Sequence, residues 1–154
     1  MKKVLYVGLD VHKESIVVAT ALQGDTEVHL YGQIGGTLDA LDKVIKKLAK
    51  PHLELRFVYE AGPCGYVIYR HLTQQKYHCE VIAPSLIPTK ASDRVKTDRR
   101  DARQLARLFR AGELTAIYVP DEEDEAVRDL VRARLSADRQ ATGPWAINAK
   151  RASV

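Results

Sequence analysis

The sequence has few cysteines and no long apolar run, and each absence excludes a class of protein. Cys64 and Cys79 are the two cysteines in 154 residues, and they fit neither a disulfide framework nor the spacing of a zinc site. We expect both to be reduced, buried or half-buried thiols without a catalytic role. No stretch approaches the roughly 18 consecutive apolar residues of a membrane span. The sequence therefore predicts no membrane partner.

The N-terminus also lacks the apolar segment of a signal peptide. Two lysines follow Met1, and the apolar run after them is too short for a targeting segment. The pattern is more typical of a first strand that leads directly to a charged residue. We therefore expect a cytoplasmic protein.

Composition indicates a compact domain with an uneven distribution of charge. Hydrophobic residues make up 45% of the chain and charged residues 29%, which excludes a disordered acidic tail. The formal net charge is a modest +4. Eight lysines and arginines, however, lie between Lys90 and Arg110, and an acidic run begins at Asp121. A basic cluster is expected at a phosphate-binding surface, although a solvated helix face has the same pattern.

Alternating and helical periodicities predict five strands and four helices. The predicted strands are 4–10, 15–22, 27–34, 54–59 and 79–83. The predicted helices are 37–50, 66–75, 98–111 and 120–138, with an irregular basic loop at 85–97. Thr37 is the expected N-cap of the first helix, and Gly112 is the expected C-cap of the third. Three strands that can meander antiparallel precede strands that alternate with helices, so we expect an α/β fold with a mixed sheet covered by helices.

Two acidic residues stand where predicted strands end. Asp10 closes the first strand, and Glu60 follows the fourth. Ligands of open α/β sheets gather beyond the carboxyl ends of strands, especially where the strand order reverses. Two carboxylates brought together there repel each other unless a cation lies between them, and Mg²⁺ prefers carboxylate oxygens. The pattern predicts a metal site.

The predicted helix at 98–111 adds two more acids. At about 100° per residue, one face carries Asp98 and Asp101 together with the apolar residues Ala102, Leu105, Leu108 and Phe109. The opposite face carries Arg99, Arg103, Arg107 and Arg110. The two aspartates therefore share the face that packs on the sheet. Four acids suit two metal ions roughly 4 Å apart, which would support an in-line phosphoryl displacement.

Simpler roles stay open for single residues. Asp98 can be a helix N-cap, and Asp10 can be a turn residue at a strand end. His12 can approach a metal or a phosphate, but a turn residue is the commoner role. A common metal site explains Asp10, Glu60, Asp98 and Asp101 together. The nucleic-acid contacts that we expect beside it are Lys90, Arg94, Lys96, Arg99, Arg100 and Arg103.

Three segments of the sequence resemble the DEDD transposases of the "one-ten" insertion-sequence group, which are bridge-RNA-guided recombinases. They are YVGLDVHKESIVVA around Asp10, VYEAGPCGY around Glu60, and VKTDRRDARQLARLFRAGEL around Asp98 and Asp101. The resemblance implies an RNase H-like (RuvC-like) mixed five-stranded sheet flanked by helices, with Asp10, Glu60, Asp98 and Asp101 as catalytic metal ligands. It also implies Mg²⁺ or Mn²⁺, two ions, and DNA, a guide RNA and further copies of the chain as partners.

The resemblance covers residues 4 to about 120 and ends near Ser136. Members of the family are about twice as long or more and carry a second domain with a serine nucleophile, for which Ser153 is no substitute. Gly143-Pro144 would break a helix, and the tail lacks apolar periodicity. We expect an RNase H-like catalytic domain at 1–118, followed at 119–154 by a helix and a truncated or irregular tail.

Two other functions fit parts of this pattern. The first is a non-catalytic remnant that only binds nucleic acid or a partner chain. The second is a nucleotide-binding fragment of the actin or sugar-kinase type, which shares a related sheet with a strand-end aspartate. That type needs glycine-rich phosphate-binding hairpins, which neither Gly8 nor Gly35-Gly36 supplies. We therefore prefer a transposase or recombinase domain that performs metal-dependent phosphodiester chemistry on DNA.

Overall fold

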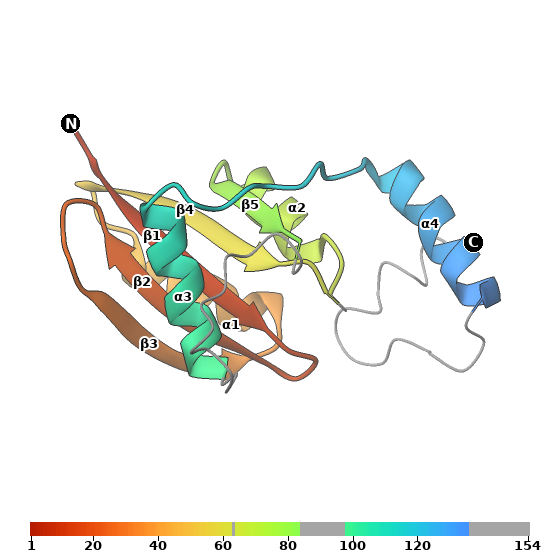
Figure 1. Cartoon of the computed structure of the whole chain (residues 1–154), viewed down its shortest axis with the longest axis horizontal. Helices are drawn as coiled ribbons and strands as arrows, with labels where there is room; N and C mark the ends of the chain where they lie inside the picture. The colour runs from red at the N-terminus through yellow and green to blue at the C-terminus, as the bar shows by residue number, and fades with distance from the viewer. Residues whose placement is uncertain (63, 84–97, 136–154) are drawn as a thin grey trace.

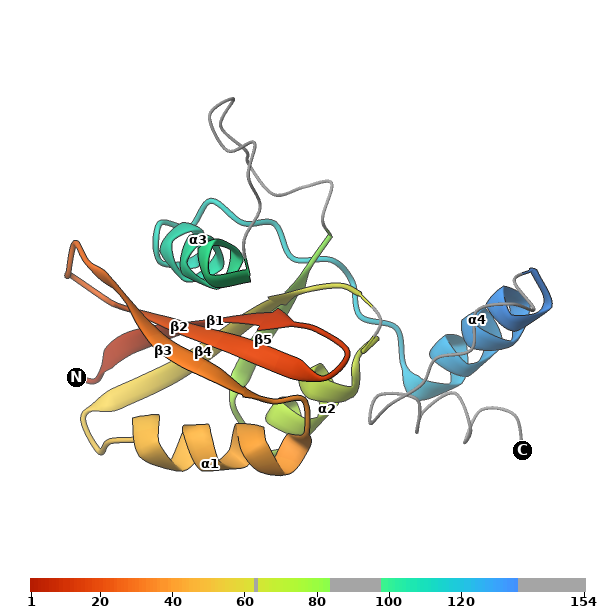
Figure 2. The same ribbon diagram turned by 90° about the horizontal axis from the view of Figure 1, so that it is seen from below.

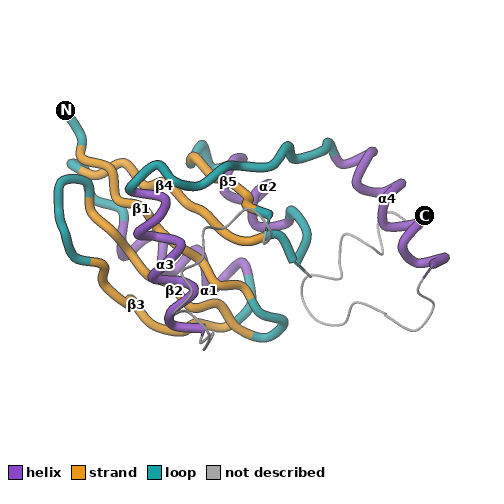
Figure 3. The backbone as a smooth tube through the Cα atoms, viewed as in Figure 1, coloured by secondary structure: helices purple, strands orange, loops and turns teal. Residues whose placement is uncertain are grey.

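A computed structural model describes residues 1–62, 64–83 and 98–135 (Figure 1). Its strands are β1 (Lys3–Val11), β2 (Ser15–Leu22), β3 (Val28–Gly35), β4 (Leu53–Glu60) and β5 (His78–Ile82). Its helices are α1 (Leu38–Leu48), α2 (Val67–Gln74), α3 (Asp98–Arg110) and α4 (Glu122–Leu135). The predicted order of strands and helices is therefore confirmed (Figure 3). The predicted basic loop at 85–97 and the predicted tail from residue 136 lie outside the described residues.

The predicted helix ends are confirmed at some positions and shifted at others. The Thr37 hydroxyl accepts a hydrogen bond from the Ala40 amide, so Thr37 is the N-cap of α1. The same helix ends at Leu48, two residues before the predicted Lys50, because Pro51 disfavours the helical conformation of the residue that precedes it. Helix α4 begins at Glu122 instead of Pro120, because the Asp121 carboxylate accepts from the Asp124 amide and caps the first turn.

The five strands form one mixed sheet in the order β3-β2-β1-β4-β5. Strands β1, β2 and β3 form an antiparallel meander, whereas β4 lies parallel to β1 and β5 lies parallel to β4. After β1 the chain first builds the sheet toward β3 and then returns through α1 to build toward β5. The strand order therefore reverses between β1 and β4, at the centre of the sheet.

Helices cover both faces of the sheet (Figure 2). On one face, α1 and α2 pack on the odd-numbered side chains of β1 and β4, such as Leu9, Phe57 and Tyr59. On the other face lies α3, whose Leu105 and Phe109 pack with Val58 of β4 and Ile82 of β5. Helix α4 stands apart from the sheet (Figures 1 and 2). None of the described helices is long and apolar enough to cross a membrane.

Helix α3 approaches β1 so closely that its backbone touches the strand. A Cβ atom on Gly8 would lie 2.4 Å from the Ala102 carbonyl oxygen and 2.7 Å from the Ala106 amide nitrogen. The other buried residues at this contact are also small, chiefly Ala19 and Ala21 of β2. Small side chains let the helix axis lie close to the sheet, and at residue 8 the close approach requires glycine.

The far end of α3 is held by a cap and a side-chain bridge. Gly112 adopts a φ of 72°, and the Glu113 amide returns a hydrogen bond to the Leu108 carbonyl, as in a Schellman cap. The predicted C-cap is thus confirmed. The Arg110 guanidinium donates to the Glu27 carbonyl at 2.7 Å and to the Thr26 carbonyl at 3.3 Å, in the turn between β2 and β3. Both ends of the helix axis are therefore defined relative to the sheet.

Replacing Gly8 with alanine is expected to destabilise the protein by about 1–3 kcal/mol, because the added methyl group overpacks a backbone-to-backbone contact. Urea unfolding followed by circular dichroism measures the change. Gly35→Ala is the matched control, since its Cβ would lie 4.0 Å from the nearest atom and should alter the midpoint little. Equal midpoints for Gly8→Ala and the wild type would contradict the close packing.

Candidate metal centre

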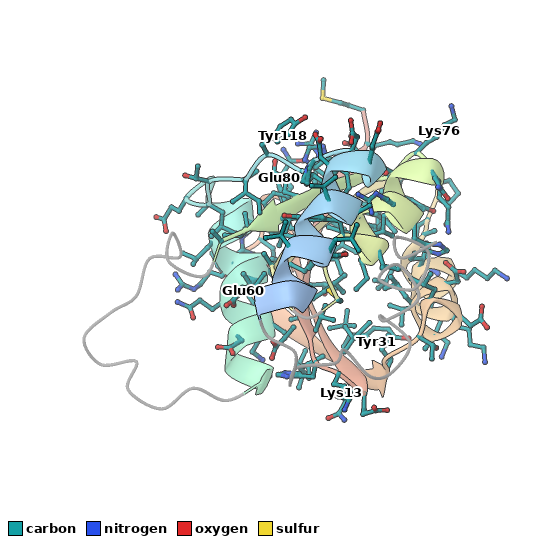
Figure 4. The ribbon with its side chains drawn as sticks, turned by 90° about the vertical axis from the view of Figure 1, so that its right-hand side faces the viewer. Lys13, Tyr31, Glu60, Lys76, Glu80 and Tyr118 are labelled. Atoms are coloured by element: carbon teal, nitrogen blue, oxygen red, sulfur yellow. The ribbon has the colours of Figure 1, made fainter. Side chains whose placement is uncertain are left out.

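The carboxyl ends of β1 and β4 lie side by side at the point where the strand order reverses. Leu9 of β1 pairs with Tyr59 of β4 in parallel register. Asp10 and Glu60 are therefore the next residues on two neighbouring strands, which lie about 4.8 Å apart in a sheet. Figure 4 views the molecule from the side toward which these strands run and labels Glu60. The sequence reasoning placed both acids at such an edge.

Strand alternation puts the two acids on the face that carries α3. Successive side chains of a strand point to opposite faces, and Leu9 and Tyr59 belong to the core on the α1 and α2 side. Val58 packs against α3, and Gly8 lies under it. Asp10 and Glu60, two residues further along each strand, therefore project on the α3 side. Asp10 is 9% exposed and Glu60 is half-buried.

The direction of α3 brings its N-terminal turn toward the same end of the sheet. The Phe109 ring, near the C-terminus of α3, packs edge-on against Tyr6 with centroids 5.2 Å apart. Ala102, two turns earlier, lies over Gly8. Moving toward the helix N-terminus thus means moving forward along β1, so the first turn of α3 lies toward Asp10.

The predicted division of α3 into two faces is confirmed where its side chains are described. Ala102, Leu105, Ala106, Leu108 and Phe109 are buried. Asp101 is half-buried, and Arg103 and Arg107 are exposed. The backbone of Asp98 begins the helix, but its side chain is outside the description.

A histidine that the sequence analysis treated as a turn residue lies against Asp10. The Nε2 atom of His12 is 2.9 Å from Oδ2 of Asp10, with side-chain exposures of 39% and 11%. Residues 10 and 12 have the same parity, so a continued strand direction places both side chains on one face. That alternation was the signal in the sequence for this contact.

Hydrogen bonds from the Tyr59 hydroxyl hold the segment that follows Glu60. The Tyr59 hydroxyl donates to the Gly65 carbonyl at 3.0 Å and accepts from the Tyr69 amide at 3.4 Å. Burial raises the pKa of this phenol well above its usual range, so it remains a donor. The Ala61 amide donates to the Ile82 carbonyl of β5 at 2.8 Å. These bonds fix the backbone on which Glu60 stands.

The donor types fit a hard divalent cation, but the described side chains do not complete a site. Carboxylate oxygens at a sheet edge are the ligands that Mg²⁺ and Mn²⁺ favour. Among the residues whose side chains are described, no three histidine, cysteine or carboxylate groups lie close enough together to hold a metal ion. Asp10, Glu60 and Asp101 belong to that set and do not by themselves form such a group, whereas the side chain of Asp98 is not described. The four-carboxylate centre therefore stays a prediction.

The predicted nucleic-acid contacts are described for one residue. Arg103 is exposed on the outer face of α3. Arg99 and Arg100 lie in the first turn of the helix, without described side chains. Lys90, Arg94 and Lys96 fall outside the described residues.

Both cysteines are buried and neither forms a disulfide, as the sequence predicts. Burial raises the pKa of the Cys79 thiol well above its usual range. A thiol of this kind is a poor nucleophile.

The strand order and the helices on both faces define this chain as an RNase H-like domain. It belongs to a family of transposases. The family model of the DEDD transposases of the IS110 type, described as "Transposase", matches residues 7–145. The resemblance carried by the three sequence segments is thus confirmed.

Two curated proteins show the same relationship. The chain is 50% identical over 133 residues to the putative transposase y4qE of Sinorhizobium fredii, which covers 86% of this chain and 34% of that protein. It is 43% identical over 137 residues to the transposase for insertion sequence element IS1533 of Leptospira borgpetersenii, covering 88% of this chain and 40% of that protein. The chain thus spans less than half the length of either relative.

Replacing Tyr59 with phenylalanine is expected to cost about 1–3 kcal/mol of stability, because it removes the buried hydroxyl that donates to the half-buried Gly65 carbonyl and accepts from the half-buried Tyr69 amide. Thermal or urea unfolding gives the difference. Tyr31→Phe, on the exposed side of β3, is the control and should change stability by less than about 0.5 kcal/mol. If both variants had the same free energy of unfolding as the wild type, the hydrogen bonds of the Tyr59 hydroxyl would not stabilise the segment after Glu60.

Proposed function

We propose that this chain is the metal-binding catalytic domain of an insertion-sequence transposase and carries out phosphodiester chemistry on DNA. The observation that carries the proposal is the placement of Asp10 and Glu60. They occupy the same register step on neighbouring parallel strands, on the face that carries α3. Asp101 is half-buried near the N-terminus of α3, and the direction of that helix along β1 brings it toward the same edge of the sheet.

Electrostatics favours a cation at this position. Two carboxylates on neighbouring strands repel each other more strongly as they are withdrawn from water, and Asp10 is almost fully buried. Asp10, Glu60, Asp98 and Asp101 would hold one or two Mg²⁺ or Mn²⁺ ions. When bound, such ions supply activation of the attacking oxygen and stabilisation of the leaving oxygen.

The residues around the carboxylates serve the substrate. Arginines on the outer face of α3 neutralise phosphate charge and hold DNA beside the acidic edge. Arg103 supplies this contact from the described helix, and Lys90, Arg94, Lys96, Arg99 and Arg100 extend it. We assign the catalytic domain to residues 1–118 and an appended helix and tail to residues 119–154. A guide RNA and further copies of the chain are its proposed partners.

One alternative has the same fold and the same family. A remnant that only binds nucleic acid or another chain would need the sheet but no working metal centre. It would bind branched DNA equally well with and without divalent ions and would not cut it. Incubating the chain with a four-way or Y-shaped DNA in Mg²⁺ and Mn²⁺ buffers distinguishes the two, because cleavage supports the enzyme and metal-independent binding alone supports the remnant.

Asp10→Asn and Glu60→Gln are each expected to abolish divalent-ion binding, because each removes a charged ligand while keeping the shape of the side chain. Titration calorimetry with Mn²⁺ and Mg²⁺ measures this. Glu54→Gln is the matched control, since Glu54 belongs to the same strand but is exposed at its other end and pairs with Arg56 at 2.8 Å. Unchanged binding in Asp10→Asn and Glu60→Gln would refute the proposed centre.

Arg103→Ala is expected to weaken DNA binding uniformly across sequences and to reduce the slope of log K against log salt by about 1, as for the loss of one phosphate contact. Fluorescence anisotropy with labelled four-way DNA at several salt concentrations gives both quantities. Lys47→Ala removes an exposed cation from α1 on the opposite face and should leave the slope unchanged. Equal slopes for all three proteins would exclude the α3 face as the DNA surface.

A further inference from the structure

The contact between His12 and Asp10 differs from two similar pairs in the described part of the chain. His29 lies 3.9 Å from Glu27, and His78 lies 3.0 Å from Glu80, each pair two residues apart in the sequence. The carboxylates of those pairs are 75% and 27% exposed, whereas that of Asp10 is 11% exposed. Water competes weakly for a buried carboxylate, so a hydrogen bond there restrains its orientation more strongly.

The turn that carries His12 is held by its surroundings. The His12 amide donates to the Ser15 carbonyl at 2.8 Å, which closes the connection between β1 and β2. The Gly36 amide donates to the Glu14 carbonyl at 3.0 Å. A Cβ on Gly36 would lie 2.8 Å from the Glu14 carbonyl carbon, so the start of α1 presses directly against this turn. The backbone that carries the imidazole is therefore held in place by its surroundings.

An ionised carboxylate accepts hydrogen bonds but cannot donate them. With Asp10 ionised as a metal ligand, the 2.9 Å contact is a hydrogen bond in which Nε2 of His12 donates to Oδ2 of Asp10. This bond restrains the rotation of the carboxylate group about the Cβ–Cγ bond of Asp10. A ligand that is already oriented loses less freedom when it binds a cation.

We propose that His12 is a positioning residue of the candidate metal centre, which orients Asp10 through the Nε2–Oδ2 hydrogen bond. The inference rests on the proposed function, because it assigns Asp10 the role of a metal ligand. It adds to that function a residue outside the four predicted acids. His12 acts through Asp10 and is not itself expected to touch the metal.

The test compares His12→Ala with His12→Gln by Mn²⁺ titration calorimetry on the full chain. Alanine removes the donor, and we expect an affinity loss of about tenfold to a hundredfold, as is usual for partners of metal ligands. Glutamine carries an amide N–H at nearly the reach of Nε2, so we expect it to restore most of the affinity. His29→Ala is the control, because it removes an exposed histidine from a pair of the same spacing.

Unfolding midpoints in metal-free buffer accompany each titration, and we expect His12→Ala and His29→Ala to change them equally little. If the wild type bound no metal, the proposed centre and this inference would both be wrong. If the wild type bound metal and His12→Ala bound it with the same affinity, this inference alone would be wrong. If His12→Gln were as weak as His12→Ala, the imidazole would be a direct ligand, which would overturn the positioning role.

Discussion

The contact between the backbone of α3 and Gly8 of β1 is the constraint on which the rest of the arrangement depends. No side chain separates the helix from the strand there, and Ala102 and Ala106 occupy the interface. The helix can therefore approach closely, and its direction and axial position are set against β1. Bonds from Arg110 to the turn between β2 and β3 hold its other end. As a result, the first turn of α3 lies toward the carboxyl end of β1, where Asp10 stands.

The two faces of the sheet are built differently, and the acids stand on the thinner one. The face under α1 and α2 is filled by large side chains such as Phe57 and Tyr59. The face under α3 contains glycine and alanine over β1 and β2 and larger apolar groups toward β5. Among the described residues, α3 is the helix that covers this face. The large core supplies stability, and the small-residue face supplies the position of the site.

The acids at this edge of the sheet need partners that balance or orient their charge. An almost fully buried Asp10 beside Glu60 on the next strand is unfavourable unless something neutralises or orients the charge. His12 provides one partner for Asp10, and a divalent cation is a further partner that we propose. Membership in a transposase family supports the function in DNA chemistry that we propose for this arrangement. The alignments cover 34% and 40% of two related transposases. A complete transposition reaction is therefore not assigned to this chain.

The sequence alone determined the local features, because periodicity and capping depend on neighbouring residues. The order of elements, the N-cap at Thr37, the C-cap at Gly112 and the apolar face of α3 all follow from short-range patterns. Only the tertiary structure decided that Leu9 pairs with Tyr59, which aligns Asp10 with Glu60, and that α3 runs against β1. Strand pairing joins residues about fifty positions apart, and no local pattern encodes its register. The contact between His12 and Asp10 also depends on the turn after β1, which Gly36 contacts from the segment between β3 and α1.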